Sequence, residues 1–389
     1  MLISLSGFAQ WIQKANVGVN YRGGAISFSV NGKGYVGAGN YNSTNLFYDF
    51  WEYDTLLNTW TQKANLPYPS GRTEAVGFSI GNKGYLCTGE GPIMNYNNDL
   101  WEFDPSSNTW TQKANFGGAA RMEAVAFVIG SKAYVGLGTS QAGHEKDFWE
   151  YDPLIDTWTQ IADFAGGSRA RPCAFSIGSY GYVGLGFDTS STNYYDFWKY
   201  DPSTNSWTSI ANFPGVETTD VVGFSIGNYG FIGTGESYSP FIVKKDFWGY
   251  NPATDFWVQL DSVPGISETR RIGFSIGNYG YIGTGQGSNY NNFYNDFWKY
   301  TPDTLLLSMT DNKINSYISI FPNPATNNLT IETPEKATIE ILNVEGQIIK
   351  TINTADKQTT IDVADLSSGI YIIKAKTERG VAVKKFIKE

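Results

Sequence analysis

The side chains that most often act as general bases or metal ligands near neutral pH are scarce in this chain. It has one histidine, His144, with no cysteine close to it in sequence, and two cysteines, Cys87 and Cys173, far from each other. One imidazole cannot form a histidine-rich metal site, and no glycine-rich loop opens a helix that could hold a phosphate. We therefore predict no metal, no cofactor and no catalytic residue. His144 is expected to be a solvated loop residue, and the cysteines to be small core residues without a disulfide.

A recurring aspartate could also indicate a metal site. It stands two residues before a tryptophan in six similar stretches of the chain, at Asp49, Asp99, Asp147, Asp196, Asp246 and Asp296. A residue that is present in every stretch is expected to hold that stretch together rather than to bind one ligand. We therefore expect each carboxylate to cap backbone N–H groups at the start of a strand.

Charged residues that differ between these stretches are better candidates for a functional site. One aligned position holds Arg22, Arg72, Arg121 and Arg169, and then Thr218 and Glu268. Two residues later the chain has Gly24, Glu74, Glu123, Arg171, Asp220 and Arg270. Because function is expected where repeats differ, we predict ligand contacts by the charged members, which are Arg22, Arg72, Glu74, Arg121, Glu123, Arg169, Arg171, Asp220 and Arg270. Salt bridges between the arginines and Glu74 or Glu123 are an open alternative.

Tyrosine and asparagine gather in the variable segments that follow the second strand of each stretch. Tyr41, Tyr96 and Tyr290 lie in such segments, each beside two or more asparagines. Tyrosine offers an amphipathic stacking surface and asparagine offers adaptable hydrogen bonds, which suits sugars or peptides. We add these three tyrosines to the predicted ligand-binding residues. The alternative is that these residues only make flexible loops soluble.

Tryptophan spacing shows which elements must position these residues. One tryptophan recurs at intervals of 48 to 50 residues and a second follows nine residues later, as in Trp101 and Trp110. The sixth stretch, which starts at Trp298, lacks its second tryptophan, whereas Trp11 near the N-terminus has the matching context. A ring explains this arrangement, because the first strand then completes the last sheet and leaves no open edge.

Each stretch of about 50 residues contains four short strand patterns, such as those of residues 223–226, 231–235, 246–250 and 257–260. Small residues dominate the first two strands and aromatic residues dominate the last two. A wedge-shaped blade that is narrow at the axis and wide at the rim requires this gradient. Both faces of the third strand are apolar, as expected for blades that stack on both sides.

A period near 50 residues with four strands per unit is typical of kelch propellers. The chain resembles the kelch family over about residues 10–303, and residues 103–110 are close to its signature between the third and fourth strands. The glycines after the second strand are separated here, as in Gly136-Leu137-Gly138, where kelch repeats usually have adjacent glycines. The resemblance implies ligand binding on the face that carries the predicted residues. Some six-bladed kelch proteins act on sialic acids as mutarotases, which implies an enzymatic alternative.

Composition limits the choice of partners. The net charge of −9 argues against a nucleic-acid ligand, which needs a basic surface.

Residues 1–9 resemble the end of a secretory signal peptide, with small residues before Gln10. No later apolar run reaches about 18 residues, so we expect no transmembrane span.

The C-terminal segment has a different character. Residues 304–314 interrupt the repeat as a linker, and residues 315–389 alternate isoleucine, threonine and lysine in short strands that predict a small Ig-like β-sandwich. This segment holds nine acidic and nine basic side chains, so the whole net charge belongs to the rest of the chain. Its motifs at residues 321–325, 343–347, 366–371 and 385–388 resemble the sorting domain of type IX secretion cargo in Bacteroidetes-type bacteria. The resemblance implies interaction with that secretion machinery and a secreted or outer-membrane-surface protein.

The sequence as a whole therefore predicts an all-β chain: a six-bladed kelch-type propeller closed by its N-terminal strand, followed by the sandwich. The predicted function is a non-catalytic binding module for an extracellular glycan, peptide or protein. A sugar-acting enzyme of the sialic acid mutarotase type and a structural surface or adhesion protein are the alternatives.

Overall fold

The computed structural model describes residues 11–42, 45–67, 71–216, 218–238, 241–266, 268–288, 291–302, 318–333, 336–343, 347–354, 356–377 and 380–389. The chain divides into two compact units, a larger one with the repeats and a smaller one with the C-terminal residues. The predicted signal-peptide remnant, the predicted linker and Tyr290 lie outside the described residues. In the part of the chain that the structure describes, no helix has both the length and the apolar character needed to cross a membrane.

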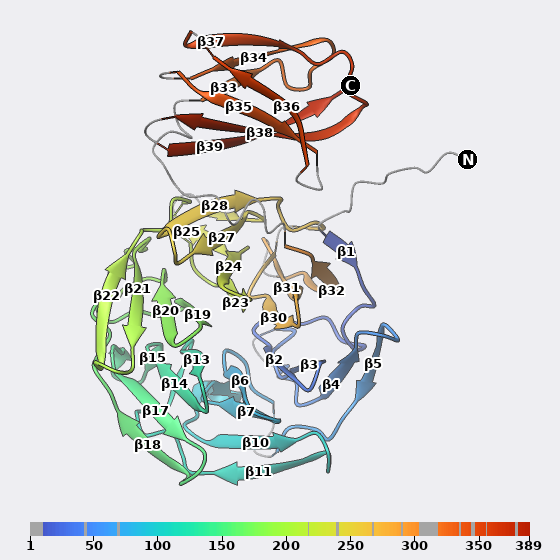
Figure 1. Cartoon of the computed structure of the whole chain (residues 1–389). Coiled ribbons are helices and arrows are strands. Elements are labelled where there is room, and N and C mark those ends of the chain that lie inside the picture. Colours follow the sequence, from blue (N-terminus) through green and yellow to red (C-terminus); the bar gives the residue numbers. More distant parts are fainter. Residues whose placement is uncertain are drawn as a thin grey trace. The chain divides into compact units, whose positions relative to one another are not determined.

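Each repeat forms one four-stranded antiparallel sheet, or blade, and the blades are arranged in a ring (Figure 1). Blades 1 to 3 consist of β2 (Ile26–Val30), β3 (Lys33–Gly37), β4 (Phe50–Asp54) and β5 (Thr59–Gln62); β6 (Val76–Ile80), β7 (Lys83–Cys87), β10 (Leu100–Asp104) and β11 (Thr109–Lys113); and β13 (Val125–Ile129), β14 (Lys132–Gly136), β17 (Phe148–Asp152) and β18 (Thr157–Gln160). Blades 4 to 6 consist of β19 (Cys173–Ile177), β20 (Tyr180–Gly184), β21 (Phe197–Asp201) and β22 (Ser206–Ile210); β23 (Val222–Ile226), β24 (Tyr229–Gly233), β27 (Phe247–Asn251) and β28 (Phe256–Leu260); and β30 (Ile272–Ile276), β31 (Tyr279–Gly287), β32 (Phe293–Tyr300) and β1 (Trp11–Gln13).

The first strands of the blades surround a common axis. Each packs against the first strands of both neighbouring blades, in a cycle that runs from β2 through β6, β13, β19, β23 and β30 and returns to β2. The predicted six-bladed propeller is therefore confirmed.

The N-terminal strand closes this ring as predicted. β1 pairs antiparallel with β32, with Trp11 opposite Tyr300 and Gln13 opposite Trp298. The pairing continues beyond the strand, where the amide of Val17 donates to the carbonyl of Asn295 at 2.8 Å. The last blade thus has four strands like the other five, and β32 is not left as an open edge of the kind that promotes aggregation.

Aromatic rings fill the space between neighbouring blades. Tyr35 and Phe50 of blade 1 stack with ring centroids 5.6 Å apart, and Phe50 meets Phe103 and Trp110 of blade 2 at 4.9 and 5.0 Å. These edge-to-face and offset contacts add to the area that each ring buries. The same pattern in the other blades makes the core continuous around the ring.

The connections after the second strands are more ordered than the sequence suggests. Several contain short ladders: β8 (Glu90–Gly91) with β9 (Asn95–Tyr96), β15 (Thr139–Ser140) with both β12 (Arg121–Met122) and β16 (Gly143–His144), and β25 (Glu236–Tyr238) with β26 (Phe241–Val243). One 3₁₀ turn, η1 (Pro92–Met94), lies between β8 and β9. In blade 6 the short strand β29 (Glu268–Thr269) pairs directly with β31. These ladders place side chains near the axis.

The C-terminal unit is the predicted small sandwich. One sheet has the order β33 (Ser319–Phe321), β34 (Asn328–Glu332), β37 (Gln358–Asp362), and the other β36 (Ile348–Asn353), β35 (Thr338–Leu342), β38 (Gly369–Thr377), β39 (Gly380–Lys388). Leu329 and Ile331 from the first sheet and Ile339, Ile341 and Phe386 from the second belong to one buried cluster. Alternation of inward apolar and outward polar residues produces this core, as expected for sheets that face each other.

Candidate functional site

One residue from each blade lies just before the first strand, and together these residues form an inner ring around the axis. Its members are Gly24, Glu74, Glu123, Arg171, Asp220 and Arg270. All six have φ between 51° and 61°, in the left-handed region. Backbone hydrogen bonds pass from blade to blade: the amides of Gly24, Glu74 and Glu123 each donate to the preceding member's carbonyl at 3.0 Å. Left-handed residues other than glycine are strained, and functional sites often retain such strain.

A second residue from each blade forms an outer ring. It directly follows the second of the separated glycines after the second strand, of which blade 2 has only Gly89, and the six members are Asn40, Glu90, Thr139, Phe187, Glu236 and Gln286. Each pairs by an antiparallel bridge with the residue that precedes the inner-ring residue of the same blade, as Thr73 does with Glu90. We call these twelve positions the channel mouth. The sequence analysis missed the outer ring, although the change of residue type after each Gly-x-Gly was a signal that could have revealed it.

The separated glycines explain why the outer ring can lie so close to the next blade. Gly138 has φ +89°, and its amide donates to the carbonyl of Arg169 in the following blade at 3.0 Å. A Cβ atom at this position would lie 2.4 Å from the carbonyl oxygen of Met122. Met122 lies before the first strand of the same blade, so only glycine allows this loop to pack against that segment while also bonding to the next blade.

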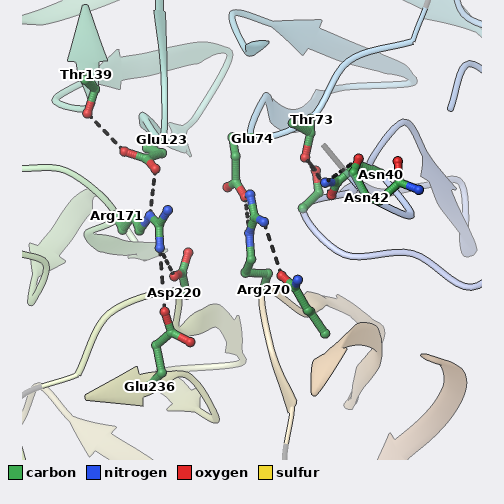
Figure 2. A network of polar contacts seen from close by, with 12 residues as sticks. Asn40, Asn42, Thr73, Glu74, Glu123, Thr139, Arg171, Asp220, Glu236 and Arg270 are labelled. Carbon is green, nitrogen blue, oxygen red and sulfur yellow. Dashed lines mark hydrogen bonds and ion pairs between the residues drawn. The ribbon is translucent and has the colours of Figure 1, made fainter. Parts of the chain in front are cut away.

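Arg171 is the centre of one charged cluster at the channel mouth (Figure 2). Its Nε donates to Glu123 at 2.7 Å, and its Nη1 donates to Asp220 at 2.7 Å and lies 3.6 Å from a carboxylate oxygen of Glu236. The Arg171 side chain is 21% exposed, whereas those of the three carboxylates are nearly or fully buried. The three partners come from blades 3 and 5, so Arg171 joins the blades on either side of its own.

Arg270 is the centre of the other cluster. Its guanidinium group pairs with Glu74 through Nε and Nη2, and its Nη1 donates to Gln286 at 3.2 Å. Arg270 belongs to blade 6 and Glu74 to blade 2, so the pair spans the position of Gly24 in blade 1. A Cβ atom on Gly24 would lie 2.8 Å from Oε1 of Glu74. The absence of a side chain at this position is therefore what allows the two charged groups to meet.

Two carboxyl groups at the channel mouth have raised pKa values. Burial raises the pKa of Asp220 to about 7, against the opposing charge of Arg171 and with support from the nearby charge of Glu74. Burial also raises the pKa of Glu90, and the charges of Glu74 and Glu123 add to this effect. Burial is the main cause of both shifts, and the neighbouring carboxylates add to it because like charges disfavour ionisation.

A central cavity of about 200 Å³ adjoins the inner ring. All six inner-ring residues line it, together with small residues in or directly before the first strands, such as Ala25, Ala75 and Ala174. Because residues from every blade contribute, the cavity lies on the axis. A concave polar space with convergent charged groups is the usual form of a small-ligand site.

Side chains beyond the two rings extend the polar network. Glu123 accepts a hydrogen bond from Thr139 at 3.0 Å, and Thr139 is 3.1 Å from Nδ1 of His144. His144 is half-buried against the edge of Phe187, with ring centroids 5.4 Å apart, so the expectation of a solvated histidine was wrong. The short ladder of β15 and β16 holds His144 in this position, which the sequence could not indicate.

The two described tyrosines of the prediction differ in environment. Tyr96 is half-buried, and its pKa is raised by burial and by the charges of Glu90 and Glu123. Tyr41 is 45% exposed and its ring lies 5.3 Å from that of Phe293. Tyr96 therefore lies beside the channel mouth, close enough to sense its charges, whereas Tyr41 lies on a more exposed surface.

The four predicted arginines Arg22, Arg72, Arg121 and Arg169 have a different role from the predicted one. All are buried, and each forms a bidentate ion pair with the aspartate that precedes the third strand of its blade. In Arg121, for example, Nη1 and Nη2 lie 2.5 and 2.9 Å from the Asp147 oxygens. A guanidinium group that is buried and already paired with a carboxylate cannot contact a ligand, so we remove these four residues from the candidate site. They also do not pair with Glu74 or Glu123.

The repeated aspartates are structural, as expected, but with more partners than those predicted. Asp147 accepts hydrogen bonds from Arg121 and from the indole Nε1 of Trp149 at 2.7 Å, in addition to a backbone hydrogen bond at the start of the strand. Burial alone would raise the pKa of Asp147, but the hydrogen bonds and charge of Arg121 outweigh it and lower the pKa. Within the described residues, no group of three or more His, Cys, Asp or Glu side chains is arranged to hold a metal ion.

The closed ring of six four-stranded blades, with its non-repeating charged residues gathered around the axis, defines a six-bladed β-propeller. The chain belongs to the kelch-repeat family, because the model of the KLHDC2/KLHL20/DRC7 Kelch-repeats domain matches residues 29–224. The solved structure of YjhT is similar with a TM-score of 0.63 at 15% identity, covering 73% of this chain and 96% of that one, which shows the fold alone. No curated protein matches the chain.

The C-terminal residues have a separate match. Residues 319–389 match the secretion system C-terminal sorting domain. This domain indicates export by type IX secretion to the cell surface or beyond, and it implies interaction with that machinery. The protein is therefore a secreted or surface-exposed kelch propeller.

Proposed function

We propose that the secreted propeller, taken as residues 10–303, is a non-catalytic binding module whose ligand is held at the channel mouth. The ligand is a glycan, a peptide or a protein segment. The observation that supports this proposal most is the central cavity, whose charged lining differs from blade to blade. The residues that build the blades repeat, whereas the residues around the cavity do not. Arg171 and Arg270 remain 21% and 16% exposed there, within reach of a ligand.

The test is binding of the full-length protein to a mixed glycan and peptide array, compared with Arg171→Ala and Arg270→Ala variants. We expect each variant to change the affinity for the ligand that the parent binds at least tenfold, because either substitution also releases carboxylates that the arginine holds in place. Lys146→Ala is the matched control, because Lys146 is 60% exposed and pairs with Asp163 on the outer surface. If both arginine variants bound the ligand with the affinity of the parent, the binding site would lie on the surface around Tyr41 instead. No binding at all would favour the structural or adhesive alternative.

A sugar-acting enzyme is the second candidate, and one observation favours it. Asp220, beside Arg171, has a pKa of about 7, which is suitable for a group that exchanges protons near neutral pH. This candidate predicts that the protein accelerates the interconversion of sugar anomers, followed by nuclear magnetic resonance. Asp220→Asn would abolish that acceleration while the protein still unfolds in a cooperative thermal transition. Equal rates with and without protein would leave the binding module as the function.

A further inference from the structure

The twelve positions of the channel mouth carry an excess of negative charge. Five of them hold carboxylates, namely Glu74, Glu90, Glu123, Asp220 and Glu236, and only two hold cations, Arg171 and Arg270. None holds a lysine. With every group ionised, the two rings together carry three more negative than positive charges.

Both arginines are already paired with these carboxylates. Arg171 contacts Glu123, Asp220 and Glu236, and Arg270 contacts Glu74 and Gln286. A ligand carboxylate at either guanidinium group would have to displace a carboxylate of the protein. It would also lie beside the remaining ones, and like charges this close repel strongly at partly buried sites.

A cationic ligand at the channel mouth would be attracted by these carboxylates instead of repelled. The Glu90 carboxylate is partly exposed and forms no ion pair with a described residue. Its pKa and that of Asp220 are both raised, so an added positive charge would make the ionised forms of these groups more stable. By linkage, the same interaction strengthens the binding of the cation.

The size of the cavity and the neutral polar groups at or beside the channel mouth limit the choice of ligand further. A space of about 200 Å³ admits one amine-bearing group, such as a sugar ring or a lysine side chain, and not a folded domain. Asn40, Thr73, Thr139 and Gln286 supply neutral hydrogen-bonding groups near the charged clusters.

We propose that the channel mouth selects a ligand that carries a primary ammonium group, and that it rejects carboxylated sugars. This inference rests on the proposed binding function and names the chemistry of its ligand. The ammonium group can come from an amino sugar or from a lysine side chain, and the test separates these sources.

The experiment is calorimetric titration of the full-length protein at pH 7.5 with matched pairs of small probes. Glucosamine is compared with N-acetylglucosamine and glucuronic acid, and Nα-acetyl-lysine amide with its Nε-acetylated form. We expect the free amine of at least one pair to bind tenfold or more tightly than its acetylated partner, and we expect glucuronic acid to bind more weakly than either sugar. The pair that shows the larger difference identifies the source of the amine.

Two variants connect this selectivity to the channel mouth. Glu90→Gln removes one negative charge without breaking an ion pair and should weaken binding of the amine severalfold. Asp163→Asn, which removes a charge from the outer surface, should leave it unchanged. The inference would be overturned if an acetylated or carboxylated probe bound more tightly than the corresponding probe with a free amine. The proposed binding function would still stand in that case. Absence of binding to every probe would also overturn the inference, and absence of array binding as well would overturn the proposed function.

Discussion

At the scale of single residues, the chain uses arginine in two ways that the sequence does not distinguish. The arginine two positions before the inner ring is buried against an aspartate and stabilises its blade. The arginines of the inner ring itself are partly exposed and pair across blades. Only the distances and the burial separate these roles, because both kinds of arginine lie within three residues of each other in the fourth repeat, at Arg169 and Arg171.

Arg121→Ala should lower the free energy of unfolding by about 3–5 kcal/mol, because it leaves the carboxylate of Asp147 without its partner in a largely buried site. The substitution also removes the contact of the guanidinium group with the ring of Phe116, 4.9 Å away. Urea unfolding measures this change. Lys146→Ala in the same blade breaks an exposed ion pair and should change stability by less than about 1 kcal/mol. Equal effects of the two substitutions would contradict the structural role of Arg121.

Asp220 should make stability depend on pH near neutrality. Its folded-state pKa of about 7 exceeds the ordinary value of 3.8, so the folded protein holds this proton more tightly than the unfolded chain does. The contribution of this proton to the free energy of unfolding is complete below pH 3.8. It is lost as the pH rises to 7, which lowers the free energy of unfolding by between about 1 and 4 kcal/mol. Arg171, Glu74, Arg270 and Glu236 face the group and set this shift.

The measurement is the melting temperature of the parent and of Asp220→Asn at pH 5.0 and 7.5. The variant should lose less stability than the parent between these two pH values. Glu268, whose pKa is raised to about 8 mainly by burial, contributes a second loss in the same direction, so Glu268→Gln serves as the comparison. Parallel curves for the parent and Asp220→Asn would show that Asp220 is ionised throughout.

At the scale of elements, the connection after each second strand decides how close the blades lie. The Gly-x-Gly segment brings the backbone of one blade against the loop before the first strand of the next. The same segment places the outer-ring residue beside the inner ring. Sequence analysis treated the separated glycines only as a departure from the kelch pattern, and so it missed the six residues that follow them.

Gly138→Ala should therefore destabilise the protein by at least about 3 kcal/mol, the sum of a left-handed backbone and of steric overlap. The new Cβ would lie 2.4 Å from the carbonyl oxygen of Met122 and 2.8 Å from the amide of Ala124. Gly130→Ala is the matched control in the same blade, because its φ of +60° is also left-handed but no atom lies within 4 Å of the new Cβ. That control should cost about 1–2 kcal/mol. Thermal unfolding of both variants tests the difference, and similar costs would exclude close approach as the reason for the second glycine.

At the scale of the whole molecule, the sequence predicted more of the fold than of the site. Twelve tryptophans in a regular period are required by the packing of every blade, so they mark blade number and ring closure directly. The site depends on contacts between blades that only the closed ring brings together, such as Arg270 with Glu74, 196 residues earlier. The inner-ring residues could be identified from the sequence because they vary at one aligned position. The ion pairs that they form with residues of other blades could not be predicted from the sequence.

Ring closure also predicts that the N-terminal strand is as important to stability as an internal one. Trp11 lies 4.8 Å from Tyr300 and 5.0 Å from Phe247, and its indole donates to the carbonyl of Asp261 at 3.0 Å. Trp110 in blade 2 has equivalent neighbours. The ring centroids of Phe103 in the same blade and of Phe50 in blade 1 are both 5.0 Å from that of Trp110. Trp11→Ala and Trp110→Ala should therefore each cost about 3–5 kcal/mol.

A closed ring and an open array of repeats predict different stability costs for Trp11→Ala. In an open array of repeats, a terminal strand frays independently and its loss costs little. In the closed ring, removing Trp11 weakens both blade 6 and its packing against blade 5, so unfolding by urea should remain a single transition with a lower midpoint. Ile12→Ala, on the exposed face of the same strand, is the control and should change stability by less than about 1 kcal/mol. A cost for Trp11→Ala close to that of Ile12→Ala, or a separate early transition, would mean that β1 does not close the propeller in solution.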